Sequence, residues 1–449
     1  MAVLAALYAV AWLAPAVGLA YRDGVFLAAA VNHQLGEGLF PVALMPFALL
    51  SRQPQWLKLT PLACTILWLI LTRRLLTRMG ASPECATFLV VITAASPTVI
   101  YLATGLFAEP LFALLITVAL LSLLDDKPLQ AGLCAGLATV TLTAGIALIV
   151  AILITLVATR RLRDATVFTC AAMAPTAPWL GWQLSHGGVP AAALHLSELA
   201  MLTGNNAMLI AASPFTLLSG YPSLYPGLLT AVALLIVLVR RRYFVPDLFI
   251  GFYCLILIWR TESPLHAFAP VLPLFLWMLW RVARSGRFAL VTRATAILMI
   301  APALWFGASR VATVPRLGAV TSENGTPDNW REMEKLFAFI RTSTPADARL
   351  LADLDPVFFL NTGRITLRGF APDGYREYYA PPGALVNPDG LRAAIARGGV
   401  NYVVLTPDLD LPESKSFHMA AAAMERGGVL EPVSVPGVAG GYRLLRVVK

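Results

Sequence analysis

The sequence predicts an α-helical membrane protein with many crossings, followed by a separate C-terminal α/β domain. Hydrophobic residues make up 58% of the 449 residues, charged residues make up 13%, and the mean hydropathy is +0.72. This composition leaves too little polar side chain to cover a soluble protein of this size. From about Arg316 the composition changes, because this last segment holds 15 of the 34 Lys and Arg residues and 15 of the 25 Asp and Glu residues.

Apolar runs recur along the first 314 residues and predict about eleven transmembrane helices. The first run has no basic leading segment and no cleavage site, so it is expected to remain as a span. Only 32 residues, 128–159, separate two basic ends that face the same side, and two short or re-entrant helices are expected there. The predicted spans are 2–20, 57–72, 86–104, 109–124, 128–142, 143–159, 165–183, 224–239, 244–259, 264–280 and 290–309.

The distribution of Lys and Arg predicts the topology of these spans. Before residue 315, fourteen cations fall in every second break between spans, and only five fall in the intervening breaks. Cations in short loops mark the cytoplasmic side, so the N-terminus is predicted to be cytoplasmic. Loops 21–56 and 185–223 and the segment 315–449 are then external. The net charge of +9 is explained by the cytoplasmic loops, and no nucleic-acid partner is expected.

Outside the spans, the sequence predicts several further elements. The run Leu39–Leu50 is too short to cross a membrane and is expected to lie in the interface. Four of the five cysteines fall within predicted spans and Cys85 directly precedes one, so no disulfide framework is expected. In the C-terminal segment, apolar spacing and turn residues predict helices at Pro327–Thr342 and Leu391–Arg397 and strands at Arg349–Asp353, Asn401–Leu405 and Tyr442–Val448.

Two acids at span ends are the first candidates for chemistry. Asp23 follows the first span directly, and Glu109 is the one charge between Ala86 and Ser122. Acids at membrane depth are rare and often functional. Each acid also has a purely structural interpretation. Asp23 fits a solvated loop acid beside Arg22, and Glu109 fits an acid at the start of a helix, facing the positive end of the helix dipole.

Three segments, in order, resemble the GT-C superfamily of integral membrane glycosyltransferases that use polyprenyl-phosphate sugars. Related branches include protein O-mannosyltransferases, lipid A aminoarabinose transferases and mannosyltransferases of GPI-anchor assembly, and the external C-terminal domain resembles the bacterial branch. The third segment departs from the pattern, because many relatives carry Arg or Lys before the final glycine and Thr141–Gly145 has no cation. The three segments are Tyr21–Ala30 continuing to Leu39–Phe47, Ala95–Thr98 with Gly105–Phe112, and Gly132–Ala138 with Gly145.

The resemblance implies a multi-pass protein of a bacterial inner membrane, with residues 1–314 as a transmembrane glycosyltransferase domain and 315–449 as a periplasmic α/β domain. The reaction implied is inverting transfer of a sugar from a polyprenyl-phosphate donor to a glycan, lipid or protein acceptor, with Asp23 as the base. Such a reaction needs cations for the leaving phosphate. The expected residues are Asp23 and Glu109 for catalysis, Arg260, His266 and Arg22 for donor phosphate, and His33 and Glu262 for substrate.

Several alternatives stay open at this stage. Arg260 also fits an interfacial cation paired with Glu262, and His266 fits a buried structural histidine. A divalent metal ion held by Asp23 and Glu109 would lack further ligands, so metal dependence is open. A transporter or flippase of lipid-linked sugars is the competing class, although the span interiors are mostly uncharged. The missing cation near Gly145 keeps open an inactive relative that acts as a scaffold.

Overall fold

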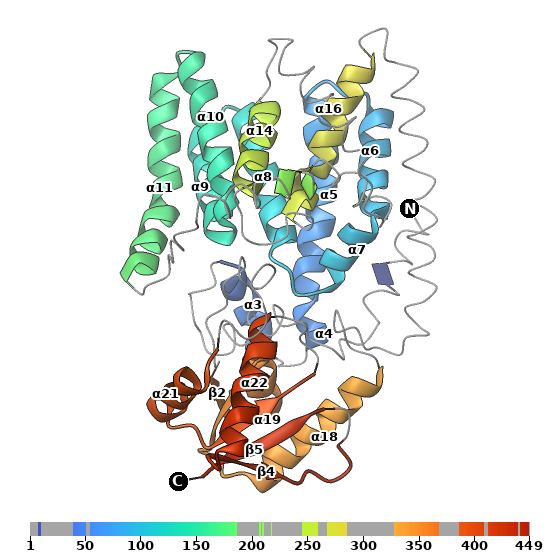
Figure 1. Cartoon of the computed structure of the whole chain (residues 1–449). Helices are drawn as coiled ribbons and strands as arrows, with labels where there is room; N and C mark the ends of the chain where they lie inside the picture. Colours follow the sequence, from blue (N-terminus) through green and yellow to red (C-terminus); the bar gives the residue numbers. More distant parts are fainter. Residues whose placement is uncertain are drawn as a thin grey trace. The chain divides into compact units, whose positions relative to one another are not determined.

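The structure is a computed structural model that divides into two compact units. The helical unit holds the described residues up to Arg284, and the C-terminal unit holds those from Pro327 onward (Figure 1). The structure describes residues 8–9, 39–50, 54–185, 206–207, 209–210, 217, 245–258, 267–284, 327–367, 386–407, 412–438 and 441–448.

The helices of the helical unit follow most of the predicted spans for which residues are described. The predicted span 109–124 is one helix with those bounds, and the predicted interfacial run is a helix over Leu39–Leu50. The short pair expected within 128–159 is also present. The helices are α3 (Leu39–Leu50), α4 (Pro54–Leu57), α5 (Leu59–Arg78), α6 (Pro83–Ala95), α7 (Pro97–Thr104), α8 (Glu109–Leu124), α9 (Pro128–Thr141), η1 (Thr143–Gly145), α10 (Ile146–Ala158), α11 (Leu162–Ser185), α14 (Val245–Ile258), η2 (Ala269–Val271) and α16 (Leu272–Arg284).

The span predicted over 86–104 is not one continuous helix. The chain forms two helices there, α6 and α7, bent by 68° at a break around Ser96. The Ser96 hydroxyl accepts a hydrogen bond from the Val99 N–H at 3.4 Å, and Pro97 has no N–H with which to continue α6. A Ser-Pro pair therefore ends one helix and starts the next.

The helix lengths bear on membrane crossing. Among the described residues, α5 alone is long and apolar enough to cross a membrane, and the bent pair α6 and α7 passes the same test together. Shorter apolar helices of 10–17 residues lie over Glu109–Leu124, Thr143–Ala158, Val245–Ile258 and Ala269–Arg281. The eleven crossings stay a prediction, and the predicted spans 2–20, 224–239 and 290–309 lie almost wholly outside the described residues.

Two glycines bring α9 and α11 into close contact. A Cβ on Gly132 would lie 2.3 Å from the Phe168 carbonyl oxygen, and a Cβ on Gly136 would lie 2.3 Å from the Ala172 carbonyl oxygen. Gly136 follows Gly132 by four residues in α9, and its contact Ala172 follows Phe168 by four residues in α11. The two helices run parallel, and small residues allow their backbones to touch.

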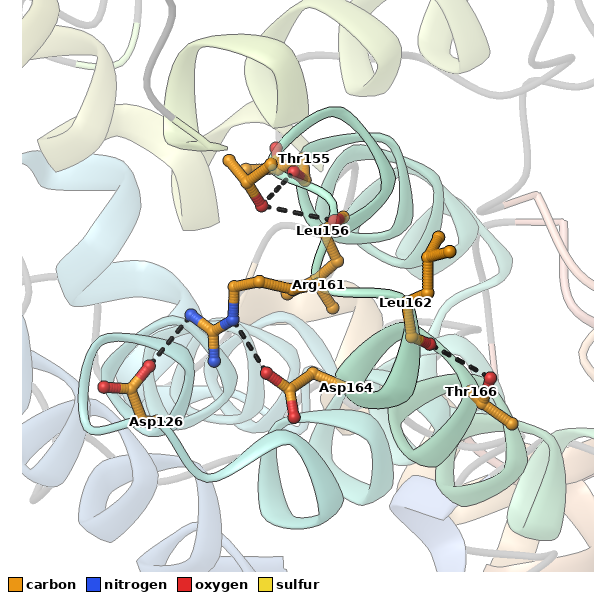
Figure 2. A network of polar contacts seen from close by, with 8 residues as sticks. Asp126, Thr155, Leu156, Arg161, Leu162, Asp164 and Thr166 are labelled. Atoms are coloured by element: carbon orange, nitrogen blue, oxygen red, sulfur yellow. Dashed lines mark hydrogen bonds and ion pairs between the residues drawn. The ribbon is translucent and has the colours of Figure 1, made fainter.

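Charged side chains hold the starts of these two helices together. Arg161, just before α11, pairs with Asp126 at 2.8 Å and with Asp164 at 2.7 Å, as Figure 2 shows. Asp126 belongs to the turn that leads into α9. At the same turn Arg78, the last residue of α5, bonds to Asp125. The ends of α5 and α8 and the starts of α9 and α11 are therefore linked by ion pairs.

The C-terminal unit is a five-stranded mixed sheet with helices on both faces (Figure 1). The strand order is β2-β1-β3-β5-β4, with β1 parallel to β2 and β3, and with β5 antiparallel to β3 and β4. One apolar cluster joins the sheet to α18 and α19, and another joins it to α21 and α22. The elements are α18 (Pro327–Ser343), β1 (Arg349–Ala352), α19 (Asp355–Thr362), β2 (Ile365–Leu367), α21 (Pro388–Gly398), β3 (Tyr402–Leu405), α22 (Pro412–Arg426), β4 (Leu430–Val433) and β5 (Arg443–Val447).

A buried carboxylate joins the ends of two parallel strands to α22. The Asp353 side chain, directly after β1, accepts from the Thr406 hydroxyl at 3.0 Å, the Ser414 hydroxyl at 2.7 Å and the Leu354 N–H at 3.0 Å. His418 Nε2 lies 3.3 Å from its second oxygen. Several hydrogen bonds to one charge are what a buried carboxylate requires. Asp353 therefore fixes the carboxyl ends of β1 and β3, the edge of the sheet from which α19 and α22 start.

A second acid close to this edge titrates abnormally. The pKa of Asp355 is raised to about 7, mainly by burial and also by the negative charge of Asp353, against a backbone hydrogen bond that lowers it. Asp355 opens α19, where the helix dipole favours a negative charge. Removal from water outweighs that preference, so the carboxyl of Asp355 is partly protonated near neutral pH.

The contact between α9 and α11 predicts the effect of one added methyl group. Gly132→Ala should destabilise the helical unit by about 1–3 kcal/mol, because the new Cβ overlaps the Phe168 carbonyl. Gly181→Ala in α11 is the matched control, since a Cβ there meets nothing within 4 Å and alanine favours a helix. Thermal unfolding of the purified full chain measures both. Equal melting temperatures for the two variants would contradict the close contact.

The titration of Asp355 predicts a pH dependence in the C-terminal unit. Its pKa rises from 3.8 to about 7 on folding, so the folded state binds more protons between these values. Stability from this group is therefore lost as the pH rises towards about 7, and changes little above it. Asp355→Asn should remove that loss, whereas Asp347→Asn, at an exposed acid, should keep it. The measurement is hydrogen exchange of peptides from 349–362 at a series of pH values, corrected for intrinsic exchange rates. If the assignment is wrong, the slope of protection against pH is the same in Asp355→Asn as in the wild type.

Candidate functional site

Glu109 is the one predicted site residue that falls among the described residues. It is the first residue of α8 and is 2% exposed. Ala108 precedes it without a side-chain cap, and Pro110 follows in the first turn, so the chain starts a helix here without a neighbouring hydroxyl. The carboxyl group is thus held at a helix N-terminus inside the protein, where the helix dipole favours its charge.

Four elements surround Glu109. A small cavity of about 10 Å³ lies beside it, roughly the space that one water molecule needs. The lining is apolar except for Glu109 and Thr65, and the Thr65 hydroxyl already donates to the Pro61 carbonyl at 2.8 Å. A sugar does not fit into this space. The lining residues are Thr65 and Trp68 from α5, Val99 and Leu102 from α7, Pro110 and Ala113 from α8, and Ala269 and Pro270 from η2.

The bend at Ser96 builds one wall of this cavity. Besides capping α7, the Ser96 hydroxyl donates to the Leu217 carbonyl at 2.6 Å and is fully buried. The bond therefore ties the break between α6 and α7 to the chain near the end of the predicted external loop 185–223. Because α7 supplies Val99 and Leu102 to the lining, the break decides which residues face Glu109.

Two further polar side chains hold segments that adjoin predicted site residues in the sequence. Asn206 donates its amide to the Leu257 carbonyl at 3.4 Å and to the Ile258 carbonyl at 3.0 Å, at the end of α14. These carbonyls precede Arg260 by two and three residues. Such carbonyls lack partners within a helix, so the amide stabilises the end of α14.

Tyr253 fixes the start of the segment that follows His266. Its hydroxyl, on α14, donates to the carbonyl of Ala267. The ring is fully buried and stacks with Phe112 of α8 at a centroid separation of 5.9 Å. Tyr253 therefore connects α8, the helix that carries Glu109, with the residue next to His266 in the chain.

Sequence reasoning missed the roles of Ser96, Asn206 and Tyr253. Their partners lie 121, 51 and 14 residues away along the chain. Only the Ser-Pro pair carried a local signal, as the start of a helix.

The other predicted site residues cannot be placed. Asp23, Arg22, His33, Arg260, Glu262 and His266 lie outside the described residues, so the distance from Asp23 to Glu109 is not defined. Among the residues that are described, no group of three or more His, Cys, Asp or Glu side chains has an arrangement that could hold a metal ion. Metal dependence, left open by the sequence, would rest on residues outside that set.

Sequence comparison finds no matching family model and no matching curated protein. Comparison with solved structures is informative. The chain matches the crystal structure of ArnT from Cupriavidus metallidurans in the apo state with a TM-score of 0.52 and 14% identity, over 100% of this chain and 97% of that chain. It matches ArnT from the same organism bound to undecaprenyl phosphate with a TM-score of 0.53 and 14% identity, over 100% and 98% of the two chains.

The likeness covers both units of the chain. Exposed Leu and Ile side chains such as Leu67, Ile70 and Leu255, each half exposed or more, suit a lipid environment, as does the mean hydropathy of +0.72. Both these exposed side chains and this composition are typical of a membrane protein. The whole chain has the fold of the ArnT structures, so the predicted resemblance is confirmed at the level of the fold.

Proposed function

We propose that this protein is a GT-C-type glycosyltransferase that moves a sugar from a polyprenyl-phosphate donor to a glycan, lipid or protein acceptor on the external membrane face. The fold likeness to ArnT over the full length carries the proposal. One of the matched ArnT structures holds undecaprenyl phosphate, and a donor lipid of the same class is proposed here. The bacterial inner membrane, with residues 315–449 in the periplasm, is the proposed location.

The proposed chemistry follows from what glycosyl transfer requires. Asp23 accepts the proton of the acceptor hydroxyl while the acceptor oxygen bonds to the anomeric carbon. The bond from that carbon to the phosphate oxygen breaks on the opposite face, so the configuration inverts and polyprenyl phosphate leaves. Arg260, with Arg22 and His266, would pair with the phosphate charge. His33 and Glu262 are proposed to contact the substrate.

Glu109 is proposed to act beside Asp23 by orienting the acceptor. Its burial supports this role, because a charge surrounded by apolar side chains acts over a longer range than a charge in water. The cavity beside it is too small for a sugar. A substrate would therefore reach Glu109 only from a side formed by residues outside the described set, or after the lining residues rearrange.

The base assignment predicts a loss of transfer without a loss of folding. Asp23→Asn should reduce turnover by at least a hundredfold, because general-base catalysis contributes about 10²–10⁴-fold. Purified protein with radiolabelled polyprenyl-phosphate sugars and membrane extract measures transfer. Glu37→Gln, at another acid of the segment 21–56, is the control and should retain activity. Turnover by Asp23→Asn at the wild-type rate would contradict the assignment of Asp23 as the base.

The two readings of Glu109 predict different outcomes. If Glu109 orients the acceptor, Glu109→Gln lowers turnover or raises the acceptor KM and leaves the melting temperature within about two degrees. If it only stabilises the start of α8, the melting temperature falls and the kinetic constants of the folded fraction stay normal. Glu84→Gln, at an exposed acid in the first turn of α6, is the matched control for a dipole effect. The proposal expects the first outcome.

A further inference from the structure

An apolar groove runs along the outer surface between α9 and α11. It has a volume of about 430 Å³, within the range of ligand sites at about 300–1,000 Å³. Leu129 and Leu133 of α9 form one side, and residues of α11 form the other. The α11 side consists of Thr166, Val167, Cys170, Ala171 and Ala174.

The groove begins near the end where both helices start, because Leu129 and Thr166 lie in the first two turns of α9 and α11; this end is called its mouth below. The parallel contact through Gly132 and Gly136 places the starts of α9 and α11 at the same end, and Arg161 with Asp126 ties these starts together (Figure 2). Two helix N-termini therefore lie near the mouth of one groove. Each carries a partial positive charge, which favours an anion.

Cations flank this mouth. Arg163 lies three, four and seven residues before Thr166, Val167 and Cys170, so helical spacing puts it on the face of α11 that lines the groove. Lys127 directly precedes α9. Both side chains are exposed, and neither forms an ion pair with any residue in the described part of the chain.

The acids near this mouth are already engaged. Asp126 and Asp164 both pair with Arg161, at 2.8 and 2.7 Å. These two acids share the one positive charge of Arg161, which leaves one negative charge. Lys127, Arg160 and Arg163 add three positive charges, so the rim keeps a net positive charge. An apolar groove that ends at a cationic rim is complementary to a lipid with one apolar chain and an anionic head.

We propose that this groove binds an anionic phospholipid of the bilayer, with one acyl chain between α9 and α11 and the phosphate at Arg163 and Lys127. An acyl chain gains little by leaving other lipid chains, so selection must come from the headgroup. Basic pockets between helices on the cytoplasmic side are known to suit such headgroups. The cation distribution predicts that this end is cytoplasmic, opposite to the face of the proposed transfer, so the site is distinct from the donor site.

Native mass spectrometry of the full chain tests the headgroup. The protein is equilibrated with equal amounts of phosphatidylglycerol and phosphatidylcholine of identical chains, and the retained lipid is counted. Wild type should retain phosphatidylglycerol at least fivefold over phosphatidylcholine, and Arg163→Gln should reduce that preference at least threefold. Arg74→Gln is the matched control, because Arg74 is 62% exposed on α5 and contacts Asp125 of the same turn. Equal retention of both lipids, or an equal loss in the two variants, overturns the proposal.

A second pair of variants tests the groove itself. Val167→Trp fills the groove and should lower retention of phosphatidylglycerol severalfold, whereas Met173→Trp, at an exposed α11 residue outside the lining, should not. Unchanged retention in Val167→Trp overturns the acyl-chain assignment. In a last experiment, undecaprenyl phosphate is added in an equal amount. Complete displacement of phosphatidylglycerol would assign the groove to the polyprenyl lipid instead and overturn the proposal.

Discussion

Inside an apolar protein placed in an apolar membrane, every polar group must find its hydrogen-bond partner within the chain. Many threonines of the helical unit meet this constraint locally. The hydroxyls of Thr65, Thr93, Thr117, Thr139 and Thr155 each donate to the carbonyl four residues earlier, at 2.8 to 3.0 Å. Ser96 supplies the missing bond at the start of α7, and Asn206 supplies it at the end of α14. The placement of α7, and with it the wall of the Glu109 cavity, depends on those few side chains.

The same constraint explains the two tight turns at the cation-rich end. Asp126 and Arg160 have left-handed backbones, with φ of 55° and 58°, a conformation that usually requires glycine. At each turn the next N–H bonds to a carbonyl of the preceding helix, Lys127 to Ser122 and Arg161 to Leu156, both at 2.8 Å. One of the two residues, Asp126, also forms the ion pair with Arg161.

Proline and composition made much of the fold predictable. Pro110 and Pro128 lie in the first turns of α8 and α9, and the predicted starts agree with the structure. The break at Ser96 was missed, since apolar residues on both sides of the Ser-Pro pair carry one continuous hydrophobic signal. In the C-terminal unit the edge strands β2 and β4 were missed because they have three and four residues and little alternation. The candidate site was predicted only through Glu109, because its walls come from contacts distant in the chain.

The shortness of α9 and α10 has a consequence for the surrounding lipid. At about 1.5 Å per residue, a helix of 14 residues is roughly 21 Å long, less than the roughly 30 Å of a hydrocarbon core. The two helices meet at Thr143–Gly145, where a Cβ on Gly145 would lie 2.6 Å from the Thr139 nitrogen, so the turn admits no bulkier residue. If the pair crosses the membrane as the sequence predicts, hydrophobic mismatch requires the bilayer to thin beside it, or water to reach its turn. A thinned patch would shorten the path of any lipid headgroup that moves along the protein from one leaflet towards the other.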